Sequence, residues 1–191
     1  MKRLALLLLI LTGVIPAYAQ LFFTEKEPND SLAQAQFLDT KENKFVVFGD
    51  RTTTNRSADW YRVWGSKGTR VDFVVNTTGG SFMQNDPIFG LFDSTGRELV
   101  FNDNLLGPYG LDAGVLNYYI LNSGYYYVAV SAHGDRNFRG GGGSGRDSIW
   151  RYNLGVVRTT VPEPSEWAVI SLSVMGVGGL MFRASRRSKI S

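Results

Sequence analysis

The sequence predicts an all-β protein whose exported part folds as an antiparallel β-sandwich, and three observations predict it. Short apolar runs rich in β-branched and aromatic residues recur along the 191-residue chain. Glycine, asparagine, aspartate and serine separate these runs. Helical periodicity is almost missing between the two ends of the chain. Many short strands at this spacing are typical of two packed antiparallel sheets.

Eight strands are predicted in the middle of the chain, each ended by turn residues. The alternation is clearest over 70–76, where Val71, Phe73 and Val75 share one face. Tight turns such as the Asn-Ser-Gly at 122–124 join neighbouring strands. The predicted strands are 45–48, 60–64, 70–76, 88–92, 98–101, 116–121, 125–131 and 152–156.

The segments between the strands contain one short helix and three loops. The helix is predicted over 31–36. Loops are predicted at 52–57, 103–114 and 136–147 because these segments are polar or rich in glycine. The last loop contains four consecutive glycines, which offer no side chain to a core, so we expect it to be mobile.

The N-terminus, residues 1–19, is predicted to be a secretory signal peptide. Two basic residues precede an apolar run over 4–11, which is too short to span a bilayer. Ala17 and Ala19 put small residues where signal peptidase cleaves, so the mature chain would begin at Gln20. An uncleaved anchor helix is the alternative, and the proline just before this site opposes it.

The C-terminus, 161–191, combines a short motif, an apolar stretch and a basic end. The apolar stretch over 167–182 is short for a spanning helix, but a bilayer can thin around such a helix. The basic residues after it should stay cytoplasmic. These features predict a transmembrane helix that anchors the tail in a membrane, with its basic end in the cytoplasm. The motif consists of Val161, Pro162, Glu163, Pro164 and Ser165, and the basic end, 183–189, contains Arg183, Arg186, Arg187 and Lys189.

The order of these three parts resembles the PEP-CTERM sorting signal of Gram-negative bacteria that make exopolysaccharide. An ordinary tail anchor is the alternative. The resemblance implies that an exosortase recognises the tail in the inner membrane and removes it near the motif. The protein would then reach the cell surface, the outer membrane or the extracellular matrix.

Charge and composition limit the function classes open to the mature chain. The whole chain has a net charge of +3, but segment 20–164 carries 14 Lys and Arg against 16 Asp and Glu, a net charge of −2. The basic character therefore belongs to the targeting segments, and no nucleic-acid partner is expected. The chain has no cysteine, which excludes a thiolate zinc site and a cysteine nucleophile.

Six short motifs follow one another in a fixed order along the middle of the chain. They are EKEPNDS at 25–31, DWY at 59–61, DPIFGLFD at 86–93, ND at 102–103, GYYYVAV at 124–130 and YNL at 152–154. This order resembles the bacterial pre-peptidase C-terminal (PPC) domain over 22–158. The resemblance implies a sandwich of the jelly-roll kind. Such domains usually accompany secreted peptidases and include the collagen-binding domains of clostridial collagenases.

The first motif is a candidate calcium site. Glu25, Glu27, Asn29 and Asp30 place four oxygen donors within six residues, and Ca²⁺ prefers oxygen ligands in a flexible array. In the collagen-binding relatives that the chain resembles, the matching segment and acidic residues just before the second strand bind calcium. Asp59 matches one of these residues. If the five residues form one site, the N-terminal segment must fold back against the start of the second strand.

One departure from the resembled pattern bears on this site. Position 56 is Arg56, where the collagen-binding members have an acidic residue. The cation either weakens the calcium site, or its guanidinium pairs with Glu25 or Glu27 and replaces the ion. The competing interpretation of the segment is that Asp30 or Ser31 merely caps the short helix.

Catalysis is not expected, so the chain is not predicted to be an enzyme. His133 is the only histidine, and it lies beside the glycine-rich loop. A Ser-His-Asp site needs this imidazole buried against an acid and a serine, and Ser131 is the serine on the same face of the strand. An exposed histidine at the edge of a loop is the expectation.

The tyrosines at the start of the 125–131 strand are candidate ligand contacts. Alternation puts Tyr126 on the face opposite Tyr125 and Tyr127. One set should pack the core and the other should be partly exposed, where it can stack on sugars or grip an extended peptide. Stabilisation of the sheet by cross-strand aromatic pairs is the alternative.

The sequence therefore predicts an exported, exosortase-sorted surface or matrix protein with a non-catalytic binding domain. Its expected partners are signal peptidase, the exosortase, the inner membrane through its tail, and exopolysaccharide or a surface protein. Calcium is the one expected cofactor. An accessory or degenerate secreted hydrolase domain and a purely structural coat component are the alternatives.

Overall fold

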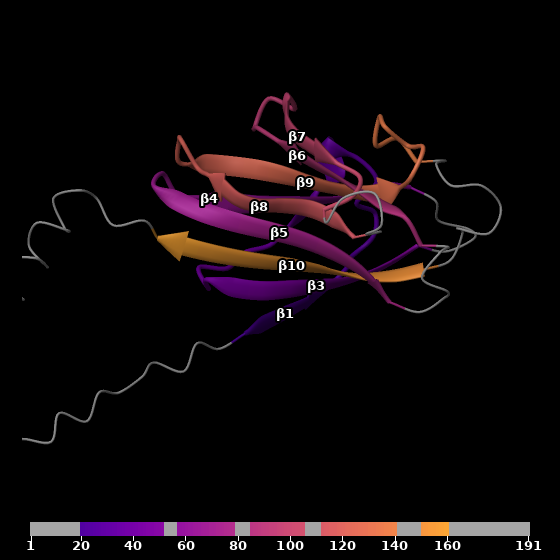
Figure 1. Ribbon diagram of the computed structural model, residues 1–191, viewed down its shortest axis with the longest axis horizontal. Coiled ribbons are helices and arrows are strands. Elements are labelled where there is room, and N and C mark those ends of the chain that lie inside the picture. The colour runs from indigo at the N-terminus through magenta and orange to yellow at the C-terminus, as the bar shows by residue number, and fades with distance from the viewer. Residues whose placement is uncertain (1–19, 52–56, 79–84, 106–111, 141–149, 161–191) are drawn as a thin grey trace, which may run out of the picture.

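Two five-stranded sheets pack face to face in the computed structural model (Figure 1). The structure describes residues 20–51, 57–78, 85–105, 112–140 and 150–160. The strand order is β1-β3-β10-β5-β8 in the first sheet and β2-β4-β9-β6-β7 in the second. The prediction of an all-β sandwich is confirmed.

The first sheet consists of β1 (Leu21–Thr24), β3 (Lys44–Arg51), β5 (Thr69–Thr78), β8 (Ala113–Tyr119) and β10 (Trp150–Thr160). The second sheet consists of β2 (Gln36–Phe37), β4 (Asp59–Gly65), β6 (Pro87–Phe92), β7 (Glu98–Asn102) and β9 (Gly124–Ala132). All eight predicted strands are present as β3 to β10. The last strand, β10, lies between β3 and β5 and is antiparallel to both.

The sequence did not indicate β1 and β2, and both depart from the antiparallel pattern. Leu21 pairs with Phe45 as β1 runs parallel to β3, and Gln36 pairs with Tyr61 as β2 runs parallel to β4. Each forms one edge of its sheet. A two-residue strand such as β2 is too short to show alternation.

Two predictions for the segments between the strands are wrong. The predicted helix over 31–36 is a single 3₁₀ turn, η1 (Leu32–Gln34), because the chain enters β2 at Gln36. The predicted loop over 103–114 ends early, since β8 begins at Ala113.

The main hydrophobic core lies between the two sheets. Val71, Phe73 and Val75 of β5 all face it with no more than 2% of their surface exposed, as their alternation predicts. From the second sheet, Tyr61 and Val128 face the same core and are fully buried.

A second hydrophobic cluster covers the outer face of the second sheet. Trp60 packs there against Phe92 and Phe138, and its Nε1 donates to the Phe138 carbonyl oxygen at 3.4 Å. Phe138 is buried although it falls in the predicted glycine-rich loop, so the beginning of that segment contributes to the fold. Side chains therefore pack against both faces of the second sheet.

The predicted signal peptide, 1–19, and the predicted sorting tail, 161–191, lie outside the described residues, as do 52–56 and 141–149. The expected transmembrane helix over 167–182 belongs to this part of the chain. Within the part of the chain that the structure describes, no helix has the length and apolar character needed to cross a membrane.

Candidate metal centre

The acidic segment after β1 folds back against the beginning of β4, as a single site requires. The amide of Glu25 donates to the carbonyl oxygen of Phe48 at 2.9 Å. The amide of Trp60 donates to the carbonyl oxygen of Asn29 at 2.8 Å. These backbone contacts bring the segment beside Asp59, the first residue of β4.

Three carboxylates converge at this point. Glu25, Glu27 and Asp59 each offer an oxygen, and these oxygens lie within 4.8 Å of one another. Asn29 lies beside them, because its backbone N–H donates to Oε2 of Glu27 at 2.9 Å and its side-chain Nδ2 donates to Oε1 of Glu25 at 3.2 Å. We call these four residues the acidic centre. Asp30, the fifth residue expected here, is not in the group of converging carboxylates.

One oxygen of the acidic centre has no hydrogen-bond donor in the described structure. Asn29 is fully buried, yet its Oδ1 accepts no hydrogen bond within the described residues. A buried carbonyl oxygen without a partner costs about 1–3 kcal/mol. A cation ligated by this oxygen would remove that cost, so the donor set fits a hard cation such as Ca²⁺.

Two buried tyrosines form the inner wall of the acidic centre. The hydroxyl of Tyr152 donates to Oδ2 of Asp59 at 2.6 Å, and the hydroxyls of Tyr152 and Tyr61 lie 2.6 Å apart. Since the Tyr152 proton goes to Asp59, Tyr61 is the donor in the second bond. The chain of hydroxyls connects the acidic centre with the main core.

Gly49 makes room for this arrangement. A β-carbon added at Gly49 would lie 2.3 Å from Cζ of Tyr152, far inside van der Waals contact. Gly49 and Tyr152 are direct partners in the antiparallel pair of β3 and β10. The glycine therefore lets the Tyr152 ring lie over β3 with its hydroxyl directed at Asp59.

Burial and mutual repulsion act together on the carboxyl groups. Burial, followed by the charge of Glu25, raises the pKa of Asp59 well above its usual value, and the bond from Tyr152 only partly opposes this. Burial also raises the pKa of Glu25, although the amide of Asp50 donates to its Oε2 at 2.8 Å. The folded protein therefore favours a proton or a cation at this place.

A hollow of about 450 Å³ opens onto the acidic centre from solvent. Its lining includes Glu25, Glu27 and Arg151. This hollow gives an ion a path to the carboxylates. Arg56, the departure from the resembled pattern, lies outside the described residues.

The competing interpretation of the segment as a helix cap is wrong. No side-chain hydrogen bond caps η1, and the hydroxyl of Ser31 instead donates to Oε1 of Gln34 at 2.8 Å. The helical turn is one turn of 3₁₀ geometry, which gives a capping residue little to stabilise.

Sequence reasoning missed the residues that support the acidic centre from the other strands. Tyr152, Gly49 and Asp50 had no assigned role. Tyr152 stands in a recognisable motif, YNL at 152–154, but its contact with Asp59 depends on β10 lying beside β3. A single sequence carries no signal for that pairing.

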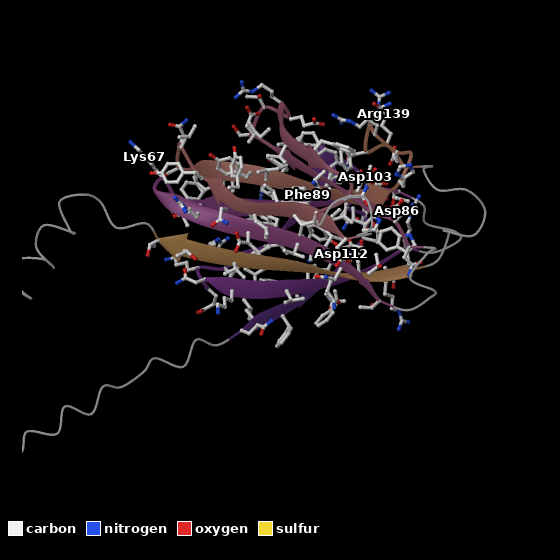
Figure 2. The ribbon with its side chains drawn as sticks, viewed as in Figure 1. Lys67, Asp86, Phe89, Asp103, Asp112 and Arg139 are labelled. Atoms are coloured by element: carbon white, nitrogen blue, oxygen red, sulfur yellow. The ribbon has the colours of Figure 1, made fainter. Side chains whose placement is uncertain are left out.

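His133 lies at the end of β9 among two aspartates rather than beside a serine. Its Nδ1 is 3.1 Å from Oδ2 of Asp103 and 3.6 Å from Oδ2 of Asp86, and its side chain is 61% exposed. Figure 2 shows Asp86 and Asp103 together at one end of the sandwich. Ser131 is buried and its hydroxyl donates to Asp135 at 2.7 Å. The described residues therefore do not place the histidine and this serine in a triad.

The three tyrosines of β9 divide between the two faces as predicted. Tyr126 faces the main core. Tyr125 is 39% exposed on the outer face. Tyr127 shares that face but packs against the second hydrophobic cluster, so it is only partly accessible. Of the two predicted ligand contacts, Tyr125 is the more open one.

Comparison with known proteins places the chain in no family. No family model matches the chain, and no curated protein matches it. Among solved structures, it is similar to PliG of Aeromonas hydrophila, a periplasmic lysozyme inhibitor of g-type lysozyme. The identity is 15%, the TM-score is 0.41, and the match covers 74% of this chain and all of the other.

Proposed function

We propose that the chain is an exported surface or matrix protein whose β-sandwich is a non-catalytic, PPC-like binding domain that holds calcium. The observation that carries the proposal is the acidic centre. Three carboxylates meet there beside buried Asn29, whose Oδ1 has no partner among the described residues, and two of these carboxylates, Glu25 and Glu27, line a hollow that opens to solvent. The sequence resemblance supports the same role, because the matching segment binds calcium in the collagen-binding members.

Calcium would be held by the carboxylates of Glu25, Glu27 and Asp59 together with Oδ1 of Asn29. Burial, followed by the charge of Glu25, raises the pKa of Asp59, and the positive charge of the ion would offset both effects. The chain itself supplies the fixed geometry: Tyr152 holds one oxygen of Asp59. The bound ion would then fasten the N-terminal segment to β4.

A binding role is favoured over a hydrolase because of the surroundings of His133. A catalytic histidine that serves as a general base is oriented by an acid and contacts its nucleophile. His133 does contact acids, but it is exposed, and the hydroxyl of Ser131 is directed at Asp135 instead. These contacts support the non-catalytic proposal over an accessory or degenerate hydrolase.

The two ends of the chain supply the cellular part of the proposal. The signal peptide directs export, and the sorting tail from Val161 onward is recognised by an exosortase in the inner membrane. The domain is then released to the cell surface, the outer membrane or the matrix, where it binds exopolysaccharide or a surface protein. The resemblance of residues 161–191 to the PEP-CTERM signal supports this route.

Calcium titration calorimetry on residues 20–160, which contain all ten strands, tests the metal centre. We expect one calcium per chain and an affinity at least about tenfold lower in Asp59→Asn, which keeps the side-chain size and removes a charge. Asp30→Asn is the matched control, because Asp30 lies in the same segment outside the converging group. Equal affinities in wild type and Asp59→Asn, or no binding at millimolar calcium, would refute the site. A glycan array probed with the same segment tests the polymer-binding part separately.

A further inference from the structure

Three exposed aromatic side chains meet at the end of the second sheet that lies away from the acidic centre. Phe37, Trp64 and Tyr125 are each about 40% exposed, at 40%, 45% and 39%. The ring centroids of Trp64 and Tyr125 are 5.1 Å apart, and those of Phe37 and Tyr125 are 5.7 Å apart. We call these three residues the aromatic platform. Exposed aromatic residues grouped in this way on a surface indicate an interaction site.

A half-buried cation, Arg62, fixes the aromatic platform in place. The guanidinium of Arg62 lies 4.7 Å from the ring centroid of Phe37 and 5.0 Å from that of Tyr125. Arg62 is also the direct strand partner of Phe37, and Trp64 is the direct partner of Tyr125. The rings are therefore held by strand pairing and by cation–π contacts. Because these side chains are already fixed, a ligand that stacks on them costs the protein little side-chain conformational entropy.

A groove of about 490 Å³ runs beside the aromatic platform between the ends of the two sheets. Trp64 and Tyr125 line it from the second sheet, and Arg158 of β10 lines it from the first. Lys41 adds a second cation, and Asp39 is the one carboxylate residue of the lining. Lys67, in the turn after β4, marks this end of the sandwich in Figure 2, opposite Asp86 and Asp103.

The guanidinium of Arg158 is held in position but is not neutralised by a carboxylate among its described contacts. Its Nη1 donates to the carbonyl oxygens of Thr40 and Glu42 at 3.2 and 3.0 Å, and its Nη2 is buried with no acceptor within the described residues. Burial lowers the pKa of this guanidinium. An anion in the groove would balance the charge of this partly desolvated guanidinium.

We infer that this groove binds an acidic sugar unit, of the uronic acid class, in an extracellular polysaccharide. The apolar face of a pyranose ring stacks on Trp64, and Tyr125, whose ring stands at 82° to that of Trp64, contacts the edge of the sugar. The sugar carboxylate pairs with Arg158 and Lys41. Charge complementarity selects the acidic class. Segment 20–164 has a net charge of −2, so two cations against one acid in the groove are a local feature. The inference rests on the proposed polymer-binding function and names its site and its ligand class.

Titration calorimetry of residues 20–160 with an oligogalacturonate of defined length tests the inference, with a neutral galactan oligomer of equal length as the comparison. We expect the acidic oligomer to bind at least about tenfold more tightly than the neutral one. Trp64→Ala, Tyr125→Ala and Lys41→Glu should each weaken binding by about tenfold, a usual cost of truncating an anchor side chain.

Two variants serve as matched controls and should bind like the wild type. Tyr119→Ala removes an equally exposed tyrosine, at 43%, from the first sheet. Arg139→Glu reverses an exposed charge at the opposite end of the sandwich (Figure 2). Circular dichroism confirms that each variant folds before its affinity is compared.

The results of these experiments distinguish a failure of the inference from a failure of the proposed function. If acidic oligomers bind equally well to Trp64→Ala and to the wild type, the binding site lies elsewhere on the protein. The proposed polymer-binding function would still stand. Preferential binding of the neutral oligomer would overturn the acidic class alone. If neither oligomer binds and the glycan array is also blank, the polymer-binding function fails together with the inference.

Discussion

The hydroxyl of Tyr152 donates a 2.6 Å hydrogen bond to Oδ2 of Asp59, although 93 positions separate the two residues. Both residues are buried, and each belongs to a different sheet. The bond therefore joins the two sheets at the acidic centre. It also sets the orientation of the one carboxylate there that comes from outside the N-terminal segment.

Calcium should stabilise residues 20–160 against heat. An ion that binds only the folded state at a hundredfold excess over its Kd contributes about 2.7 kcal/mol. For a domain of this size the melting temperature should rise on the order of 5 °C or more. Magnesium should raise it much less, because it demands a tighter octahedron of ligands. Differential scanning calorimetry in calcium, in magnesium and in EDTA measures this.

Arg56→Asp should increase the calcium effect, because it replaces a cation by an acid at the position where the resembled collagen-binding members have an acidic residue. The variant should show a larger calcium-dependent rise in melting temperature than the wild type. Identical melting curves in calcium and in EDTA, for both proteins, would leave the segment as a solvated turn.

In the absence of metal, the free energy of unfolding should depend on pH because of the carboxyl groups of the acidic centre. The pKa values of Asp59 and Glu25 are raised from ordinary values of 3.8 and 4.5, so the folded state holds protons more tightly than the unfolded chain. This contribution is fully present below those ordinary values and is lost as the pH rises through the folded pKa values. Urea unfolding in EDTA should therefore show the free energy of unfolding falling from about pH 4 toward neutrality.

Asp59→Asn should flatten that pH profile, because the amide does not titrate and still accepts the Tyr152 hydrogen bond. Saturating calcium should flatten the wild-type profile as well. Parallel profiles for wild type and Asp59→Asn in EDTA would show that the carboxyl groups of the acidic centre do not control stability.

Tyr152→Phe should destabilise the domain more than Tyr61→Phe. The first change leaves Oδ2 of Asp59 without its donor and the Tyr61 hydroxyl without its acceptor, at a cost of about 1–3 kcal/mol for each buried group. The second change leaves the bond to Asp59 in place. Urea denaturation in EDTA gives both free energies. Equal losses would mean that the contact with Asp59 contributes nothing beyond the pair of tyrosines.

Val128→Asp should prevent folding, since Val128 is fully buried in β9 between β4 and β6. A buried, unpaired carboxylate costs more than about 4 kcal/mol, much of the stability of an ordinary domain. Leu121→Asp is the control, because Leu121 is 66% exposed. Circular dichroism of the wild-type segment should show β signal with very little helix. A folded Val128→Asp protein would contradict the position of the main core.

Replacing Pro162, Glu163 and Pro164 by alanine should leave export intact and block removal of the tail. The full-length product would then stay in the inner membrane. Cell fractionation and mass spectrometry of the product measure location and size. No change in either one would rule out recognition by an exosortase.

Short apolar runs bounded by turn residues were sufficient to predict eight strands but not their surroundings. Val71, Phe73 and Val75 alternate and face the core, because a strand with one buried face imposes that period. Trp60 begins another predicted strand, yet it faces away from the main core and is buried by Phe138 on the outer face of its sheet. That burial depends on a segment 78 positions away, which no local pattern reveals.

The candidate site was also predicted only in part, because some of its contacts are local in sequence and others join distant strands. Glu25, Glu27 and Asn29 lie close in sequence, so their convergence follows from local chain geometry, and Asp59 was added by resemblance. The contribution of Tyr152 and the need for Gly49 come from the pairing of β3 with β10. Residues joined only by the packing of distant strands remain hidden in a single sequence.

The central position of β10 in the first sheet determines when the domain can assemble. In the sheet as the structure describes it, this strand alone forms hydrogen bonds both with the pair β1 and β3 and with the pair β5 and β8. Because a chain is synthesised from its N-terminus, the two halves of the sheet cannot join until residues 150–160 have been made. Contacts between such distant segments form slowly. The first sheet is therefore complete only when β10 has joined its two halves.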